Sequence, residues 1–169
     1  GCTVPDDEKD KFDNISDEYS HLYLAVSGVL RAVICISDPL RPEAHSAVAA
    51  LHKAGIKKVV MMTGDNEKTA AAVARAVGVD EYRAEVLPED KAEFIRREKA
   101  AGHTVIMIGD GVNDTPALSE ADVGIAINTG AAIAKEISDI TVSSEDLFKL
   151  VTLREISSAL MERINRNYR

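Results

Sequence analysis

The chain has 169 residues, the length of one domain or slightly more, and a hydrophobic content of 46% is sufficient for a buried core. Acidic residues outnumber basic ones by 28 to 20, and the resulting net charge of −8 disfavours a nucleic-acid backbone as partner. Aromatic residues make up only 4%, so a stacking platform for single-stranded nucleic acid is not expected. No apolar run in the sequence approaches the roughly 20 residues of a membrane-spanning helix.

The two cysteines, Cys2 and Cys35, form neither a C-x-x-C pair nor a disulfide framework, which favours a reducing compartment. Because Cys35 lies within an apolar run, we expect it to be a buried hydrophobic residue. The four histidines share no spacing typical of metal ligands. The sequence starts at Gly1 and stops at Arg169 within a helical pattern, so we expect a piece of a longer protein.

In chain order, residues 1–20 are polar and acidic and predict a solvated loop with room for one helical turn. Two apolar runs follow, at 21–26 and 29–36, and the Ser27-Gly28 pair between them predicts a β-hairpin. Pro39 and Pro42 then interrupt the chain.

From residue 43 onward, helical and strand patterns alternate. We expect helices at 43–54, 67–77, 87–101, 115–121, 131–137 and from Ser144 to the end, and strands at 57–62, 82–85, 104–108, 123–127 and 140–142. Such alternation indicates βαβ units, and therefore an α/β fold with a parallel sheet and helices on both faces.

Polar side chains collect where the expected strand at 104–108 ends. Asp110, Asn113 and Asp114 follow this strand in a glycine-rich turn. Ligands of open α/β sheets bind beyond the carboxyl ends of the strands, and oxygen side chains suit Mg²⁺ and the phosphate that it carries. An ordinary surface turn has the same composition, so this motif alone leaves both interpretations open.

Two further features favour a phosphate-binding site. Thr63-Gly64-Asp65 follows the strand at 57–62 and precedes a helix, where backbone N–H groups and the helix dipole attract anions. Lys91 lies near the start of its helix, where the dipole disfavours a cation. Its position alone leaves two interpretations open: an ordinary surface lysine, or a lysine that neutralises charge on a phosphate and a carboxylate. Together these groups indicate phosphoryl transfer. The Walker pattern is absent, which excludes a P-loop enzyme, and Asp38, directly before Pro39, is not expected to be the nucleophile.

These motifs resemble, in order and spacing, motifs two, three and four of the haloacid dehalogenase-like superfamily. They are more similar still to P-type cation-transporting ATPases of the heavy-metal (CPx-type) branch, and the resemblance extends from about residue 22 to the C-terminus. It is carried by Asp38-Pro39-Leu40-Arg41-Pro42, Met62-Thr63-Gly64-Asp65, Pro88-x-x-Lys91, Gly109-x-Gly111-x-Asn113-Asp114-x-Pro116-Ala117-Leu118, Ala121-Asp122-Val123-Gly124-Ile125-Ala126-Ile127 and Leu160-Met161-x-Arg163-Ile164-x-Arg166-Asn167.

The resemblance implies a role for each candidate residue. Asp110 would hold Mg²⁺ with support from Asp114, Thr63 and Gly64 would bind phosphoryl oxygens beside Asp65, Lys91 would neutralise an aspartyl-phosphate, and Asn113 would hydrogen-bond a phosphate oxygen. It further implies a remnant of the nucleotide-binding domain at 1–36, a phosphorylation domain lacking its first strand at 37–159, and the lead into a membrane helix at 160–169. The chain would then be a cytoplasmic part of an ATP-driven pump in the plasma membrane.

The sequence departs from this family in three places. The phosphorylated Asp-Lys-Thr-Gly motif and the adenine-binding histidine motif are both absent, and we expect them upstream of Gly1. The partners would therefore be the upstream polypeptide, which would supply most of the ATP contacts, and the transported cation. The isolated chain should not hydrolyse ATP. Without the nucleophile strand, the isolated chain could oligomerise through an open sheet edge. Asn128-Thr129-Gly130-Ala131 also stands where the family often has a second glycine pair.

Three other functions are compatible with acids at strand ends. A free-standing phosphatase of the same superfamily requires an Asp-x-Asp nucleophile motif after an N-terminal strand, which the chain does not show. A response-regulator-like phospho-acceptor requires paired acids near the first strand and a later lysine, an order not found here. A regulatory module that binds nucleotide or Mg²⁺ without turnover stays open.

Overall fold

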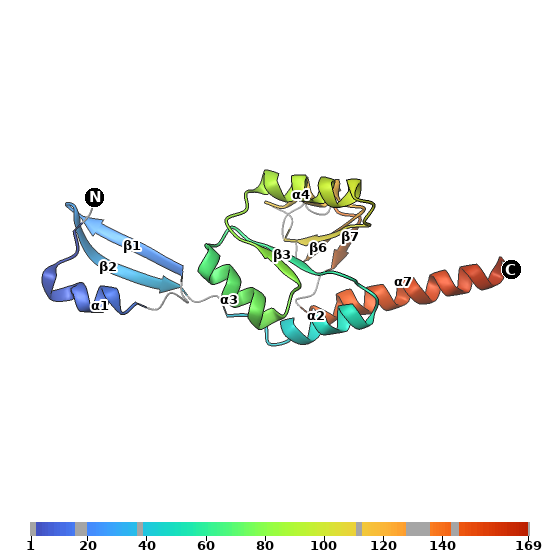
Figure 1. The fold of residues 1–169 in the computed structure, drawn as a ribbon, viewed down its shortest axis with the longest axis horizontal. Coiled ribbons are helices and arrows are strands. Elements are labelled where there is room, and N and C mark those ends of the chain that lie inside the picture. Colours follow the sequence, from blue (N-terminus) through green and yellow to red (C-terminus); the bar gives the residue numbers. More distant parts are fainter. Residues whose placement is uncertain are drawn as a thin grey trace.

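The computed structural model describes residues 3–15, 20–36, 39–110, 113–127, 136–142 and 146–168. An N-terminal hairpin lies at one end of the molecule, an α/β body forms the middle, and a long C-terminal helix projects from the other end (Figure 1). The functional candidates all belong to the α/β body.

The hairpin consists of β1 (Ser20–Val26) and β2 (Val29–Ile36), which pair in antiparallel fashion. Ser27 and Gly28 in the connecting turn both have positive φ, 54° and 78°, as the tight turns of two-residue hairpins require. The predicted hairpin is therefore confirmed. A 3₁₀ turn, η1 (Asp6–Glu8), and a short helix, α1 (Lys9–Asp13), precede it within the part expected to be a solvated loop.

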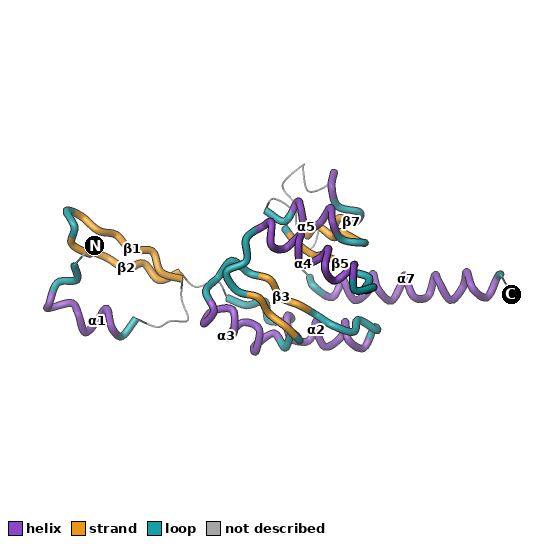
Figure 2. Tube along the Cα trace, turned by 45° about the horizontal axis from the view of Figure 1, so that its top comes forward, coloured by secondary structure: helices purple, strands orange, loops and turns teal. Residues whose placement is uncertain are grey.

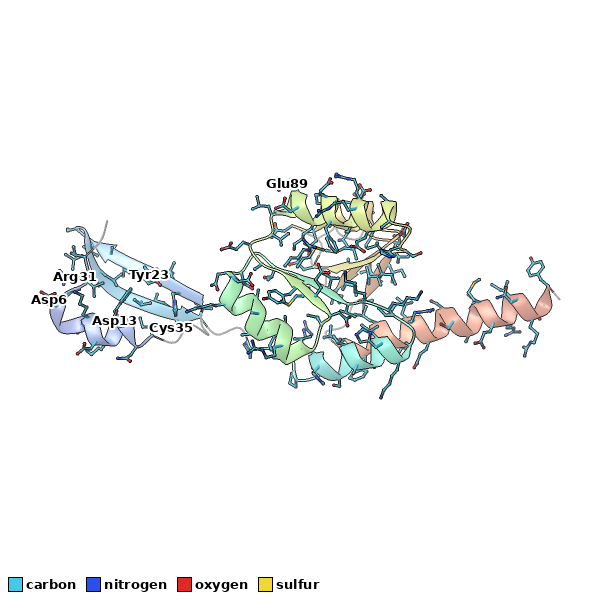
Figure 3. All side chains as sticks on the ribbon, viewed as in Figure 1. Asp6, Asp13, Tyr23, Arg31, Cys35 and Glu89 are labelled. Atoms are coloured by element: carbon cyan, nitrogen blue, oxygen red, sulfur yellow. The ribbon has the colours of Figure 1, made fainter. Side chains whose placement is uncertain are left out.

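The expectation that Cys35 is buried is wrong. Cys35 is an exposed free cysteine near the end of β2, and Figure 3 shows it on the hairpin. The described hairpin is a two-stranded sheet, and a two-stranded sheet has too little covering structure to bury residues on both faces. An apolar run therefore identified the strand correctly but not its burial.

The alternation of strands and helices is confirmed along the α/β body. The helices are α2 (Ala44–Lys53), α3 (Glu67–Val77), α4 (Pro88–Ala100), α5 (Thr115–Glu120) and α7 (Phe148–Asn167), and the strands are β3 (Val60–Met62), β4 (Glu81–Arg83), β5 (Ile106–Gly109), β6 (Val123–Ile127) and β7 (Ile140–Val142). Most of the helix expected at 131–137 lies outside the described residues.

The strands are parallel, as expected, and they are divided between two sheets. β3 pairs with β4, and β6 lies between β5 and β7. β5 is thus an edge strand among the described residues, and Ile106 and Ile108 on it are 41% and 38% exposed. Helices α2 and α3 lie on one side of the strands and α4 on the other (Figure 2).

The hydrophobic core lies between α4, α5 and β5. Their core cluster consists of Ile95, Met107, Ala117 and Leu118, with Met62, Val105 and Ala121 packed against it. Ile95 and Leu118 are each 1% exposed, and Ala117 is 0% exposed. Because Met62 belongs to β3, this cluster also connects the two sheets at the ends of their strands.

Two strands and one helix begin later than the sequence predicts. β3 starts at Val60 and β5 at Ile106, because the preceding amides of Val59 and Val105 donate to aspartate side chains. α7 starts at Phe148, whose N–H donates to Oδ1 of Asp146 at 2.9 Å; the expected start, Ser144, lies outside the described residues.

The C-terminal part of α7 has an exposed apolar surface. Ile156, Leu160 and Met161 are 61%, 55% and 54% exposed. Even so, no helix in the described ranges combines the length and apolarity that a membrane crossing requires.

Candidate functional site

The predicted site residues lie at the carboxyl ends of β3 and β5 and at the starts of the helices that follow. Thr63–Asp65 comes directly after β3 and before α3, and Asp110 comes directly after β5. Asn113 and Asp114 precede α5, and Lys91 lies in the first turn of α4. We call these residues the carboxyl-edge site. Gly111 and Val112, between its acidic residues, lie outside the described residues.

The turn after β3 is ordered by its own side chains. The Thr63 hydroxyl donates to Oδ2 of Asp65 at 2.6 Å and accepts the Asp65 N–H at 3.1 Å. Asn66 then caps α3 by accepting the Thr69 N–H at 3.0 Å. The turn therefore holds the amino end of α3 in the position that suits an anion.

A second segment fixes this turn from the side. The amide of Glu85 donates to the Asp65 carbonyl at 2.8 Å, and the amide of Val86 donates to the Thr63 carbonyl at 3.0 Å. By contrast, the space beside Gly64 is not filled by protein, since the nearest atom to an added Cβ would be the Val86 carbonyl oxygen at 3.9 Å. A glycine that the fold itself does not require is consistent with close approach by a ligand.

Lys91 and Asp114 form the central contact of the carboxyl-edge site. Lys91 Nζ donates to Oδ1 of Asp114 at 2.7 Å, and the two side chains are only 16% and 13% exposed. The role expected for Lys91, neutralisation of an aspartyl-phosphate, stays a prediction. Because both charges are largely removed from water, loss of either partner would leave the other poorly compensated.

Gly109 is required by the position of Asp114. A Cβ added at Gly109 would lie 2.5 Å from Oδ2 and 2.8 Å from Cβ of Asp114. Any larger residue at the end of β5 would therefore displace this carboxylate and the pair that it makes with Lys91.

The donor set of the site fits Mg²⁺. Asp110 and Asn113 are exposed on either side of the undescribed pair, and Asp114 lies deeper. Among the described residues, no group of three or more His, Cys, Asp or Glu side chains is arranged to hold a metal ion. Mg²⁺ does not require one, because it commonly takes one or two carboxylates and completes its shell with water and phosphate oxygens.

The structure also shows a set of acids that the sequence prediction missed, at the opposite ends of the strands. Asp80, Asp122 and Asp139 each directly precede a strand, and each accepts a backbone N–H from the neighbouring strand region. The donors are Val59, Val105 and Gly124, at 2.6, 2.8 and 2.8 Å. We call these three acids the amino-edge aspartates. An aspartate directly before a short strand is the sequence signal that could have found them.

Two amino-edge aspartates have basic side chains as partners. His52 Nε2 lies 3.2 Å from Oδ2 of Asp80, and Lys99 Nζ lies 3.4 Å from Oδ1 of Asp122. The hydrogen bond from the Val105 amide lowers the pKa of Asp122 below its ordinary value, and the nearby Lys99 charge lowers it further. These acids stabilise strand pairing and lie away from the carboxyl-edge site.

Sequence comparisons identify relatives of this chain. A family model described as haloacid dehalogenase-like hydrolase matches residues 6–122. The chain is 47% identical over 148 residues to copper-transporting ATPase 2 of Rhizobium meliloti (strain 1021), an alignment that covers 88% of this chain and 18% of the relative. It is 48% identical over 146 residues to the silver exporting P-type ATPase of Salmonella typhimurium, covering 86% and 18%.

A solved structure gives the same result at the level of the fold. The crystal structure of a zinc-transporting PIB-type ATPase in its E2.Pi state is 31% identical, with a TM-score of 0.78, and the match covers 97% of this chain and 27% of that one. The chain thus spans less than a fifth of the length of these curated relatives. The resemblance to heavy-metal P-type ATPases is confirmed, and the chain belongs to the haloacid dehalogenase-like hydrolase family.

Proposed function

We propose that this chain is the Mg²⁺- and phosphoryl-binding part of the phosphorylation domain of an ATP-driven heavy-metal cation pump. The observation that carries the proposal is the largely buried Lys91–Asp114 pair, 2.7 Å long, which joins the first turn of α4 to the residue before α5, shortly after β5 ends. A cation paired with a carboxylate at the end of a strand is part of the set of groups that phosphoryl transfer uses.

Each residue of the site then has a part. Asp110 and Asp114 hold Mg²⁺, which neutralises phosphoryl oxygens when bound. Thr63 and Gly64, with Asp65 beside them, bind the phosphoryl group at the amino end of α3. Lys91 and Asn113 then contact its remaining oxygens, and the Lys91 cation compensates the charge of the aspartyl-phosphate.

The nucleophilic aspartate would come from outside these 169 residues. The sequence contains no Asp-Lys-Thr-Gly, and β5 is an edge strand whose Ile106 and Ile108 are half-exposed. A further parallel strand beside β5 would cover those side chains and bring its own carboxyl end to the carboxyl-edge site. The upstream polypeptide is therefore the first partner that we propose, and it would also supply most of the ATP contacts.

The remaining parts fit the same assignment. Residues 1–36, whose hairpin exposes Leu22, Leu24 and Ile34 by 56%, 52% and 51%, would complete the nucleotide-binding domain, and residues 37–159 would form the phosphorylation domain. Residues 160–169 would lead toward a membrane helix in the plasma membrane, with the domain itself in the cytoplasm. The relatives are named for copper and silver transport, which supports a heavy-metal cation as the cargo.

The test is formation of an acid-stable phosphoenzyme from labelled ATP in the full-length polypeptide. We expect Lys91→Ala to reduce the steady-state phosphoenzyme by about 100-fold, because a preorganised charge at the transferred group is lost. Lys53→Ala is the matched control, since Lys53 is an exposed lysine at the end of α2 and does not belong to the carboxyl-edge site. Wild-type phosphoenzyme levels in Lys91→Ala would contradict the assignment.

The isolated 169-residue chain provides the complementary test. It should form no acid-stable phosphoenzyme and hydrolyse no ATP, because the nucleophile is supplied elsewhere. Turnover of small phosphate esters by the isolated chain would instead support a free-standing phosphatase.

A further inference from the structure

The Lys91–Asp114 pair depends on how α4 and α5 sit against each other. Lys91 lies at the amino end of α4, and Asp114 is the N-cap residue of α5. Each helix therefore presents one half of the pair, and a shift of either helix changes the separation of Lys91 Nζ and the Asp114 carboxylate.

The two helices are joined again at their other ends. Lys99, in the last turn of α4, donates from Nζ to the Glu120 carbonyl oxygen at 2.7 Å and lies 3.4 Å from Oδ1 of Asp122. Glu120 is the last residue of α5, whose final carbonyls lack intrahelical partners and carry the negative end of the helix dipole. A lysine is well suited to this position.

Between these two contacts, α4 and α5 pack against each other through fully buried side chains. Ile95 of α4 and Ala117 and Leu118 of α5 are 1%, 0% and 1% exposed and belong to one core cluster. α5 has only 6 residues, a length of about 9 Å, so a displacement at its carboxyl end is carried to Asp114 rather than absorbed within the helix.

Arg96 is a weaker candidate for the same task. Its Nε reaches Oε2 of Glu120 at 3.1 Å, but its side chain is 53% exposed and it also pairs with Glu93. Such exposed pairs contribute little to stability. The Lys99 side chain is 33% exposed, and its bond to a main-chain oxygen at the end of α5 is part-buried.

We propose that Lys99 is a positioning residue for the carboxyl-edge site: by holding the carboxyl end of α5 and Asp122, it sets the contact between Lys91 and Asp114. The proposal deepens the function proposed above and rests on it for its catalytic consequence. Its structural content, that one lysine governs the environment of another about two helical turns away on α4, stands independently.

The test is competitive acetylation of lysines in the full-length polypeptide, with acetic anhydride as probe and mass spectrometry as readout. In Lys99→Met, the labelling rate of Lys91 should rise at least threefold as its ion pair loosens. Lys99→Arg should restore most of the protection. Arg97→Met, which removes an exposed cation closer to Lys91 along α4 than Lys99 is, should leave Lys91 unchanged.

Lys58 serves as the internal reference because its ion pair with Glu81, at 2.6 Å, joins the segment before β3 to β4 and does not involve α4 or α5. An unchanged Lys91 rate in Lys99→Met would overturn the proposal. An equal rise at Lys91 and Lys58 would also overturn it, because Lys99 would then act only on overall stability.

A second measurement separates this proposal from the proposed function. In phosphoenzyme assays, Lys99→Met should raise the Mg²⁺ concentration for half-maximal labelling at least threefold while lowering the maximum less than twofold. An unchanged Mg²⁺ requirement would contradict the proposed positioning role. If the wild-type polypeptide forms no phosphoenzyme, the proposed function fails, whereas the acetylation result still decides the role of Lys99.

Discussion

The two edges of the parallel sheets use the same residue type for opposite purposes. At the amino edge, the carboxylates of Asp80, Asp122 and Asp139 accept backbone N–H groups of neighbouring strand regions, at 2.6–2.8 Å. At the carboxyl edge, Asp114 pairs instead with a lysine side chain and Asp65 with the hydroxyl of Thr63. The amino-edge aspartates satisfy backbone N–H groups and so stabilise the fold. The carboxyl-edge acids hold charged and hydrogen-bonding side chains where a ligand can bind.

The difference follows from the direction of the strands. At the start of a parallel strand, a preceding aspartate can reach the amide that opens the neighbouring ladder, and this bond fixes the strand register. At the end of a strand the chain turns into a helix, whose amino end attracts anions and whose turn residues face the crevice. The position of an acid relative to its strand is therefore more informative than its presence.

Neutralising one acid at each edge tests whether the acids of the two edges differ in function. In the full-length polypeptide, Asp110→Asn should lower Mg²⁺-dependent phosphoenzyme formation on the order of 100-fold, because a charged metal ligand is lost. Asp139→Asn should change it less than twofold, since the amide oxygen can still accept the Gly124 N–H. The measurement is phosphoenzyme level as a function of Mg²⁺ concentration.

An unchanged Mg²⁺ response in Asp110→Asn would show that Asp110 is not a metal ligand. An equally large loss in Asp139→Asn would show that the two edges are not functionally distinct.

One glycine near each edge can be substituted to test the same difference, and we expect a smaller loss of phosphoenzyme than for Asp110→Asn. In Gly124→Ala, at the amino end of β6, the new Cβ would lie 2.6 Å from the Leu118 carbonyl oxygen, so we expect destabilisation of about 1–3 kcal/mol in urea unfolding of the chain. In Gly109→Ala, the obstacle is the Asp114 carboxylate, so phosphoenzyme formation by the full-length polypeptide should fall about tenfold.

The two glycine variants should therefore differ in the measurement that they change. Gly124→Ala should lower the unfolding midpoint, whereas Gly109→Ala should reduce Mg²⁺-dependent phosphorylation more than stability. Full phosphorylation in Gly109→Ala would show that Asp114 can move without loss of function, contrary to the role given to its pair with Lys91.

Much of the fold could be predicted from the sequence, because its signals are local. The Ser27-Gly28 turn, the capping of α3 by Asn66 and the alternation of apolar strands with helices each depend on a few adjacent residues. The carboxyl-edge site could be predicted for the same reason, since Thr63–Asp65 and Asp110 directly follow their strands.

What could not be predicted depends on contacts between distant segments. The Lys99–Glu120 bond and the Val105–Asp122 bond join residues 21 and 17 positions apart, and periodicity contains no information about them. The exposure of Cys35 likewise depends on how little structure covers the hairpin, which its apolar run cannot show.

The smallest predicted effect is a pH dependence at the amino edge. The pKa of Asp122 is held below its ordinary value of 3.8, chiefly by the Val105 N–H and further by Lys99. A carboxyl whose folded-state pKa is depressed adds stability that is fully present above its unfolded-state pKa and lost as the pH falls through the lower folded-state value. Asp122→Asn keeps an acceptor oxygen but removes the charge. Its urea midpoint should therefore lie slightly below wild type at pH 7, and the gap should close as the pH falls below about 3.8.

The matched control for this experiment is Asp13→Asn on α1, outside both edges of the sheets (Figure 3). Any pH dependence that both variants share would come from the change in net charge rather than from the contacts of Asp122. A gap for Asp122→Asn that stays constant down to the acid limit would mean that the loss comes from a poorer hydrogen bond to Val105 rather than from the missing charge. Asp122 would then act only as a hydrogen-bond acceptor, and the Lys99 charge beside it would contribute nothing to holding the strands in register.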